Sequence, residues 1–194
     1  MRQLPFQRIA IFQPSLVLSE TQPSLAKPQM WSELEIWLNQ AVQAGADAVY
    51  ARLHKLAGPV QQALLLYLAS HPKLALLAPG SLQFPGLRPA AYHFRGSDTL
   101  ATAPSQDILR GRSCHDRNAV EKAISQGMDY VFLSPVFSTQ THPEAEPLGL
   151  NKLRVICSEV DIPVIALGGI HPEREKTCRL AGASGIAAIG MFLR

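Results

Sequence analysis

The sequence predicts an α/β protein, a reduced (β/α)₈ TIM barrel, and three features of the chain indicate this fold. Three segments repeat one pattern, in which a helix end is followed by glycine and then by an apolar strand: residues 43–53, 125–137 and 180–190. Their strands are nearly continuous apolar runs, which is typical of parallel strands buried on both faces. Eight such strands alternate with helical segments, and this order favours a closed barrel over its alternative, an open doubly wound sheet.

The elements follow one another in a regular order. The predicted strands are RIAIF (8–12), the strand that ends the segment 43–53, KLALLA (73–78), AAYHF (90–94), ILRGRS (108–113), YVFLSPVF (130–137), IPVIALGG (162–169) and GIAAIG (185–190). Apolar residues at helical spacing, clearest in the first of them, predict helices over residues 31–45, 60–72, 117–127, about 150–159 and 172–182. Gly45, Gly127 and Gly182 close three of these helices, because glycine accepts the left-handed backbone of a helix end.

The barrel is expected to be reduced in two places. Residues 78–107 contain four prolines and three glycines, so we expect no ordinary helix after the third and fourth strands. The sequence ends four residues after Gly190, and we therefore expect little or no final helix. Such a helix normally shields the first strand, so a homo-oligomer that covers this strand is expected. One barrel domain is expected to span residues 1–194.

Composition narrows the class of function. The chain of 194 residues carries a net charge of +3 without a run of Lys or Arg, so a nucleic-acid partner is not expected, whereas a phosphorylated small molecule would suit this charge. Cys114, Cys157 and Cys178 are odd in number and form no CxxC, which favours reduced thiols over disulfides or a zinc site. The first apolar run is too short for a signal peptide or a membrane helix, so we expect a cytoplasmic protein with no membrane partner.

The residues with useful chemistry follow the ends of the predicted strands. In barrel enzymes the active site is built there, at the carboxyl ends of the strands. Each residue alone is weak evidence, and their shared location is stronger. They are Arg52, His54 and Lys55 after the second strand, His93 and Asp98 in and after the fourth, Ser113, Cys114 and His115 at the fifth, Thr139, Thr141 and His142 after the sixth, and Gly168, Gly169 and Gly190 at the last two.

Two of these groups have specific candidate roles. Gly168 and Gly169 offer bare N–H groups before a helix start and, with Gly190, predict a phosphate cradle; a simple tight turn is the alternative. His115 is the candidate for proton chemistry, because histidine exchanges protons near neutral pH; it could instead cap the following helix or satisfy a carbonyl. Cys114 alternates with it and is expected to be a packed thiol.

The loop after the sixth strand, SPVFSTQTHPEAEPLG, holds three prolines among its polar residues. Thr139, Thr141 and His142 can donate hydrogen bonds to an anion. The prolines restrict the loop, so less entropy is lost when it closes on a ligand. A rigid surface loop that packs on the barrel is the alternative.

A known family carries these motifs together. The stretch SCHDRNAVEKAISQGMDYVFLSPVFSTQTHPEAEPLGL, followed by IPVIALGGIHPE and AGASGIAAIG, resembles the thiamine phosphate synthase/TenI superfamily over about residues 110–192. This chain has Ser-Cys-His, Ser-Pro-Val and Thr-His-Pro at the family's motif positions. In this respect it is similar to the TenI-like branch, which includes domains fused to Nudix hydrolases. The resemblance implies a (β/α)₈ barrel that acts on a thiazole phosphate in thiamine biosynthesis.

The resemblance implies two possible activities. A thiamine-phosphate synthase couples a pyrimidine diphosphate to the thiazole with Mg²⁺, whose ligands follow the third and fourth strands. Here Ala78 and Pro79 occupy the metal-ligand position that follows the third strand, and Asp98 matches the one that follows the fourth strand. A lysine that binds pyrophosphate in the synthases is replaced by His142. Arg52 and Lys55 match the basic residues after the second strand loosely.

The metal-free activity, a TenI-like thiazole tautomerase, needs no cofactor. Its histidine follows a Ser-x-His pattern that matches Ser113 and His115, so the resemblance implies that His115 is the acid/base. The phosphate would then lie at the glycines, and Thr139 and Thr141 would hold the thiazole carboxylate. We expect the tautomerase first, the Mg²⁺-dependent synthase as the alternative enzyme, and a non-catalytic barrel that binds thiazole phosphate as the third possibility.

Overall fold

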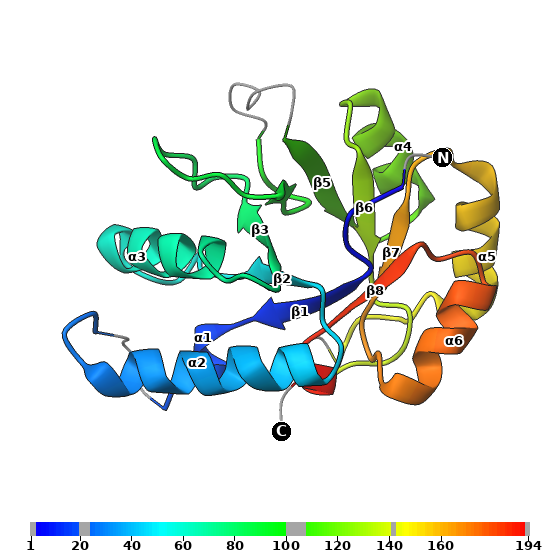
Figure 1. Cartoon of the computed structure of the whole chain (residues 1–194). Coiled ribbons are helices and arrows are strands. Elements are labelled where there is room, and N and C mark those ends of the chain that lie inside the picture. Colours follow the sequence, from blue (N-terminus) through cyan, green and yellow to red (C-terminus); the bar gives the residue numbers. More distant parts are fainter. Residues whose placement is uncertain (1–2, 20–23, 100–107, 141–142, 193–194) are drawn as a thin grey trace.

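Eight parallel strands close into one barrel in the computed structural model, which describes residues 3–19, 24–99, 108–140 and 143–192 (Figure 1). The strands pair in chain order, and β1 pairs with both β2 and β8, so the sheet is closed rather than open. They are β1 (Arg8–Phe12), β2 (Ala48–Ala51), β3 (Ala75–Pro79), β4 (Ala91–Phe94), β5 (Leu109–Cys114), β6 (Tyr130–Leu133), β7 (Val164–Leu167) and β8 (Gly185–Ala188).

The helices lie around the outside of the barrel (Figure 1). Six are found in the described ranges: α1 (Pro14–Val17), α2 (Pro28–Gln43), α3 (Gly58–Ala69), α4 (Arg117–Ser125), α5 (Gly149–Glu159) and α6 (Pro172–Leu180). The predicted helix ends are confirmed, because Gly45, Gly127 and Gly182 have φ values of 83°, 71° and 97°. The strand predicted over 130–137 was too long, since it ends at Leu133 and the chain then turns through a cis Ser134–Pro135 bond.

The barrel is reduced where the prolines predicted it. Residues 80–90, between β3 and β4, form turns without a helix, and residues 95–99 after β4 are also without one. Residues 100–107 lie outside the described ranges. After β8 the chain forms the 3-10 turn η1 (Gly190–Phe192).

Two apolar layers result from the alternation of side chains along each strand. Ile9 and Ile11 of β1 point into the barrel, whereas Ala10 and Phe12 join the layer between strands and helices. Phe6, which precedes β1, is also buried in the interior, where its ring meets Tyr130 edge-on with centroids 5.5 Å apart. Cys114 belongs to the outer layer, which confirms the prediction of a packed thiol, and burial raises its pKa to about 12.

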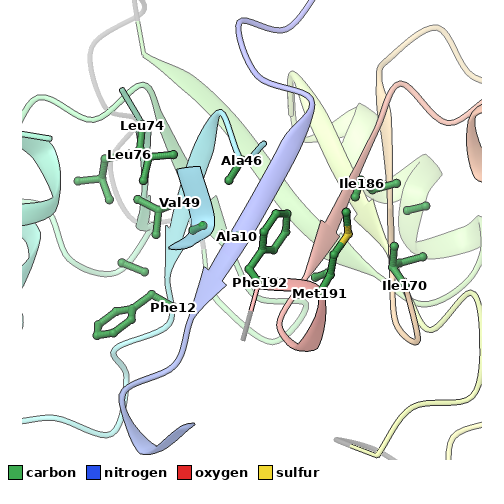
Figure 2. Packing of buried hydrophobic residues seen from close by; sticks show 14 of the residues in the cluster. Ala10, Phe12, Ala46, Val49, Leu74, Leu76, Ile170, Ile186, Met191 and Phe192 are labelled. Carbon is green, nitrogen blue, oxygen red and sulfur yellow. The ribbon is translucent and has the colours of Figure 1, made fainter. Parts of the chain in front are cut away.

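The turn η1 contributes to the outer layer beside the first strand. Figure 2 shows Phe192 next to Ala10 of β1 and Met191 beside β8. Both side chains are almost fully buried, and both belong to the same apolar cluster as Ala10 and Ile186. The outer face of the β1–β8 seam is therefore covered by η1 in the described part of the chain.

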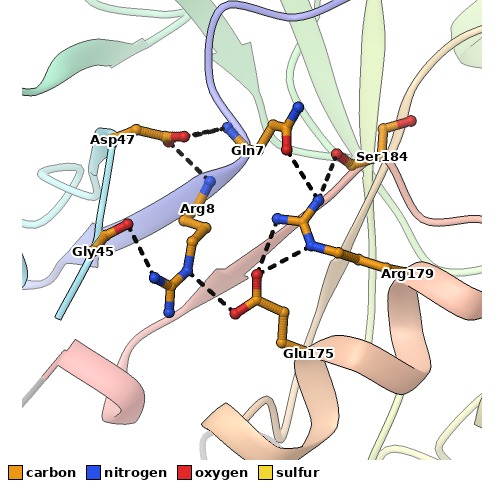
Figure 3. Close-up of polar contacts among 7 residues, drawn as sticks. All are labelled: Gln7, Arg8, Gly45, Asp47, Glu175, Arg179 and Ser184. Atoms are coloured by element: carbon orange, nitrogen blue, oxygen red, sulfur yellow. Dashed lines mark hydrogen bonds and ion pairs between the residues drawn. The ribbon is translucent and has the colours of Figure 1, made fainter.

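A charged network lies at the opposite end of the barrel from the predicted site (Figure 3). The Asp47 carboxylate accepts hydrogen bonds from the backbone N–H groups of Gln7 and Arg8. Arg8 in turn forms an ion pair with Glu175 of α6, Nε to Oε2 at 3.2 Å, and Glu175 also holds Arg179. These groups lie at or before the starts of β1, β2 and β8, and their contacts connect α6 to the bottom of the barrel.

No helix within the described ranges is long and apolar enough to span a membrane.

Candidate functional site

The candidate site lies at the barrel mouth, where the strands end. Tyr50 of β2 and His93 of β4 meet inside the barrel with ring centroids 4.8 Å apart. Arg52 and Arg95 each follow two residues later and therefore leave the barrel on its inner side, one level above this contact. By the same alternation His115 follows Ser113 of β5 at the mouth. The structure thus brings Arg52, His93, Ser113 and His115 to one rim, as strand order had indicated, and adds Arg95 to them.

The His115 imidazole is held in one orientation and remains exposed. Its Nδ1 lies 2.7 Å from the carbonyl oxygen of Ser134, which follows β6. Because a carbonyl can only accept, Nδ1 carries the hydrogen, which leaves Nε2 as the ring nitrogen available to exchange a proton. A base oriented in this way is suited to proton transfer, and the bond to Ser134 would stabilise the imidazolium that forms.

His93 is a residue of the site region to which the sequence pattern gave no role. It is fully buried, with Nε2 2.9 Å from the Ser113 hydroxyl and Nδ1 3.3 Å from the Tyr130 hydroxyl. Ser113, one of the predicted rim residues, is therefore engaged by this ring from inside the barrel. The alternation of AAYHF placed His93 on the inner face, but only the closed barrel shows which groups it meets there.

The electrostatics of His93 make it a neutral hydrogen-bonding group. Burial lowers its pKa from 6.5 to about 3, and the negative charge of Asp98 opposes that shift only in part. Burial likewise raises the pKa of Tyr50 to about 12 and that of Tyr130 well above its usual value, so both phenols keep their protons.

The buried His93 should make stability depend on pH in a defined window. Its pKa is about 3 in the folded chain and about 6.5 in the unfolded chain, so between these values the unfolded chain binds one more proton. Stability should therefore rise with pH through this window and fall as pH drops below about 6.5. Near pH 5–6 we expect a slope of about 1 kcal/mol per pH unit from this group.

Urea unfolding of the wild type and His93→Gln at several pH values measures this slope. The carboxylates titrate equally in both proteins, so the difference between their slopes isolates His93. Parallel pH dependences for the two proteins would show that His93 is not the group responsible.

Asp98 is held by an arginine on its own loop. Its Oδ1 accepts from Arg95 Nε at 2.8 Å and lies 2.7 Å from Nη2, and its Oδ2 accepts from the Arg95 backbone N–H at 2.8 Å. Partial burial alone would raise the pKa of Asp98, but these bonds and the charges of Arg95 and Arg112 hold it below its usual value. Arg112, nearly buried, also donates to the Asp98 carbonyl and fixes the loop.

These residues do not fit the Mg²⁺ site that the resemblance implies. Mg²⁺ requires several oxygen ligands in near-octahedral geometry, whereas both Asp98 oxygens are engaged by Arg95. β3 ends in Pro79, which offers no carboxylate, and no group of three His, Cys, Asp or Glu side chains in the described ranges could hold a metal ion. We therefore derive no step through Mg²⁺.

Three cations gather near the ends of β2 and β4. Arg52 is half-buried, with Nη1 3.4 Å from the Gln13 side-chain oxygen, and Lys55 is exposed. The pKa of the intervening His54 is lowered by partial burial and then by the charges of Arg52, Arg95 and Lys55. The predicted basic residues thus share this sector of the mouth with Arg95.

Gly168 and Gly169 pack against the loop that follows β6. A Cβ at Gly168 would lie 2.7 Å from Pro135 Cα, and one at Gly169 would lie 2.4 Å from the Ser138 carbonyl oxygen. The loop also donates from the Val136 N–H to the Leu167 carbonyl at 2.8 Å. The glycines therefore allow close approach of this loop, and their N–H groups remain candidate phosphate donors together with Gly190, which is exposed at the start of η1.

Arg174 joins the glycines to the loop. From α6 its Nη1 donates to the Gly169 carbonyl at 2.6 Å, and its guanidinium carbon lies 4.5 Å from the Phe137 ring centroid. Thr139 follows in the same loop and is half-buried. The predicted ligand contacts of Thr141 and His142 fall on residues outside the described ranges, so they stay predictions.

Comparisons with known proteins agree on one family. A family model described as thiamine monophosphate synthase matches residues 96–192, half of the chain. A putative thiamine-phosphate synthase 2 from Aquifex aeolicus is 48% identical over 87 residues, covering 45% of this chain and 47% of the relative. The thiamine-phosphate synthase of Chloroflexus aurantiacus is 40% identical over 99 residues, covering 48% and 46% of the two chains. The chain spans about half the length of the curated relatives it matches.

Solved structures share the barrel over nearly the whole chain. A thiamine phosphate pyrophosphorylase from Pyrococcus furiosus superposes with a TM-score of 0.70 at 20% identity, covering 95% of this chain and 86% of that one. A geranylgeranylglyceryl phosphate synthase from Thermoplasma acidophilum superposes with a TM-score of 0.64 at 17% identity, covering 97% and 87%. At these identities the likeness establishes the fold alone.

Proposed function

Because the chain belongs to the thiamine monophosphate synthase family, we propose that it acts on a thiazole phosphate of thiamine biosynthesis, as a TenI-like tautomerase with His115 as acid/base. The observation that carries this proposal is the His115 geometry. Its Nδ1–H is committed to the Ser134 carbonyl, which leaves Nε2 of this exposed side chain as the nitrogen available to a substrate.

In the proposed reaction one proton leaves a ring carbon and one returns to the exocyclic carbon. His115 Nε2 takes the first proton, and the charge that remains on the substrate spreads through the ring and its carboxylate. The imidazolium donates through Nδ1 to Ser134 while it exists, and then returns the proton from Nε2. No electrons leave the substrate, so the step requires no redox cofactor.

The other residues are proposed to position the substrate. The N–H groups at Gly168, Gly169 and Gly190 would bind the phosphate, as expected at the last two strands of a barrel. Ser113, whose hydroxyl lies 2.9 Å from His93 Nε2, is two residues before His115 and would hydrogen-bond to the thiazole. Thr139 and Thr141 would face the carboxylate from the β6 loop.

The second candidate is a thiamine-phosphate synthase, and the names of the relatives favour it over the tautomerase. Arg52 and Lys55 offer cations to a diphosphate in this case. The pairing of Asp98 with Arg95 is the observation that speaks for the metal-free tautomerase.

Proton NMR separates the candidates. The purified protein is incubated with the non-aromatic thiazole carboxylate phosphate tautomer in EDTA, and in a second experiment with thiazole phosphate, pyrimidine diphosphate and Mg²⁺. We expect appearance of the aromatic thiazole in the first. If only the second experiment gives a product, and that product is thiamine phosphate, the protein is a synthase. If neither experiment shows turnover but thiazole phosphate binds, the protein is a non-catalytic barrel.

A further inference from the structure

The disagreement between the Asp98 region and a metal site has a specific consequence. Both carboxylate oxygens of Asp98 are engaged by Arg95, whose side chain is half exposed, whereas the Asp98 side chain is only 10% exposed. A mostly buried carboxylate that bonds to an exposed guanidinium fixes the orientation of the cation. The hydrogens of Arg95 that do not face Asp98 are left to meet a ligand.

The surroundings of Arg95 are positive and open to the mouth. Arg52 leaves β2 at the corresponding level, because Tyr50 and His93, which precede these arginines by two residues, meet at 4.8 Å. The intervening strand β3 ends in Pro79, which places no charge between them. Lys55, exposed and three residues after Arg52 in the same loop, adds a third positive charge.

We propose that this sector, formed by Arg52, Lys55, Arg95 and Asp98, is an oxyanion subsite in which Arg95, oriented by Asp98, takes the place of a divalent metal ion. The proposal rests on the proposed function for the identity of the ligand. The same chemistry is offered by the carboxylate of a thiazole and by the diphosphate of a pyrimidine. Arg112 of β5 is almost fully buried, and it supports the subsite by donating a hydrogen bond to the backbone carbonyl of Asp98.

The test is calorimetric titration of the whole chain with inorganic pyrophosphate in EDTA. We expect the wild type to bind and Arg95→Gln to bind about 10- to 100-fold more weakly, the range for loss of a charge-assisted contact. Arg154→Gln, which removes the same charge from an exposed position on α5, should bind as the wild type does. Equal binding by Arg95→Gln, or wild-type binding only when Mg²⁺ is present, would overturn the proposal.

Two further titrations use the wild type and a milder variant, in case Arg95→Gln fails to fold. Arg95→Lys keeps the charge but cannot repeat the forked contact with Asp98, so intermediate affinity is expected. Mn²⁺ titration of the wild type, without other ligands, should show no binding up to millimolar concentration. Submillimolar Mn²⁺ binding that Asp98→Asn removes would contradict the replacement of the metal.

The source of the oxyanion is decided by a second pair of ligands. Thiazole phosphates with and without the ring carboxylate are titrated into the wild type and Arg95→Gln. A loss of affinity confined to the carboxylated ligand assigns the subsite to the carboxylate, and a loss confined to pyrophosphate assigns it to the diphosphate. These binding results stand apart from turnover: an inactive wild type with Arg95-dependent binding would sink the proposed function and keep the subsite.

Discussion

Replacing His115 with alanine should reduce thiazole tautomerisation by about 100-fold or more, which is the usual contribution of a positioned acid/base. The substitution removes Nε2, the only group that the proposal charges with moving the proton. His115 is exposed, and within the described ranges its side chain bonds to the Ser134 carbonyl alone, so the fold should persist. The rate is measured by proton NMR in EDTA, with thermal unfolding as the check on the fold.

His71→Ala is the matched control for that experiment. It removes a second histidine, located between α3 and β3 at the opposite end of the barrel from the mouth. It should leave the tautomerisation rate unchanged. Equal rates in the wild type and His115→Ala would eliminate His115 as the acid/base, whatever the overall activity.

Gly169→Ala should destabilise the protein by about 3 kcal/mol, because two costs combine there. Its φ of +63° is unfavourable for alanine, and the new methyl would lie 2.4 Å from the Ser138 carbonyl oxygen and 2.8 Å from Phe137 Cβ. The neighbouring atoms are largely backbone, so the β6 loop must move as a unit. Urea unfolding measures the loss, and phosphate binding by the stable fraction should also weaken.

Gly149→Ala separates the two costs. Gly149 has a similar φ of +71°, but nothing lies within 4 Å of a Cβ built there. It should therefore lose only the backbone part, about 1 kcal/mol. A loss at Gly149 as large as at Gly169 would show that close packing against the β6 loop adds nothing.

Much of the fold could be read from local patterns. Apolar runs, helix-ending glycines such as Gly127 and the prolines of residues 78–107 predicted eight strands, their helices and the reduced connections. These features depend on the backbone preferences of neighbouring residues, so they can be predicted from a single sequence. The end of β6 was misplaced, since the apolar letters continue into a loop that packs on Gly168 rather than into the sheet.

The sequence identified several residues of the candidate site but did not predict the hydrogen bonds between them. His115 could be singled out because it follows a strand end. The structure shows its bond to a carbonyl through Nδ1, and its role as a base through Nε2 stays a prediction. Asp98 was identified by its match to a family pattern. Its engagement by Arg95 was not anticipated, because a pattern records residue types and not the hydrogen bonds between them.

Strand and helix order, the reduced connections and the rim with its polar residues could all be predicted from local sequence. The contacts of His93 with Ser113 and Tyr130, the bond from His115 to the Ser134 carbonyl and the packing of the β6 loop on Gly168 and Gly169 became known only from the folded barrel. The physical reason is barrel closure: periodicity tells which face a side chain occupies, whereas its partners across the barrel depend on the pairing of strands distant in sequence.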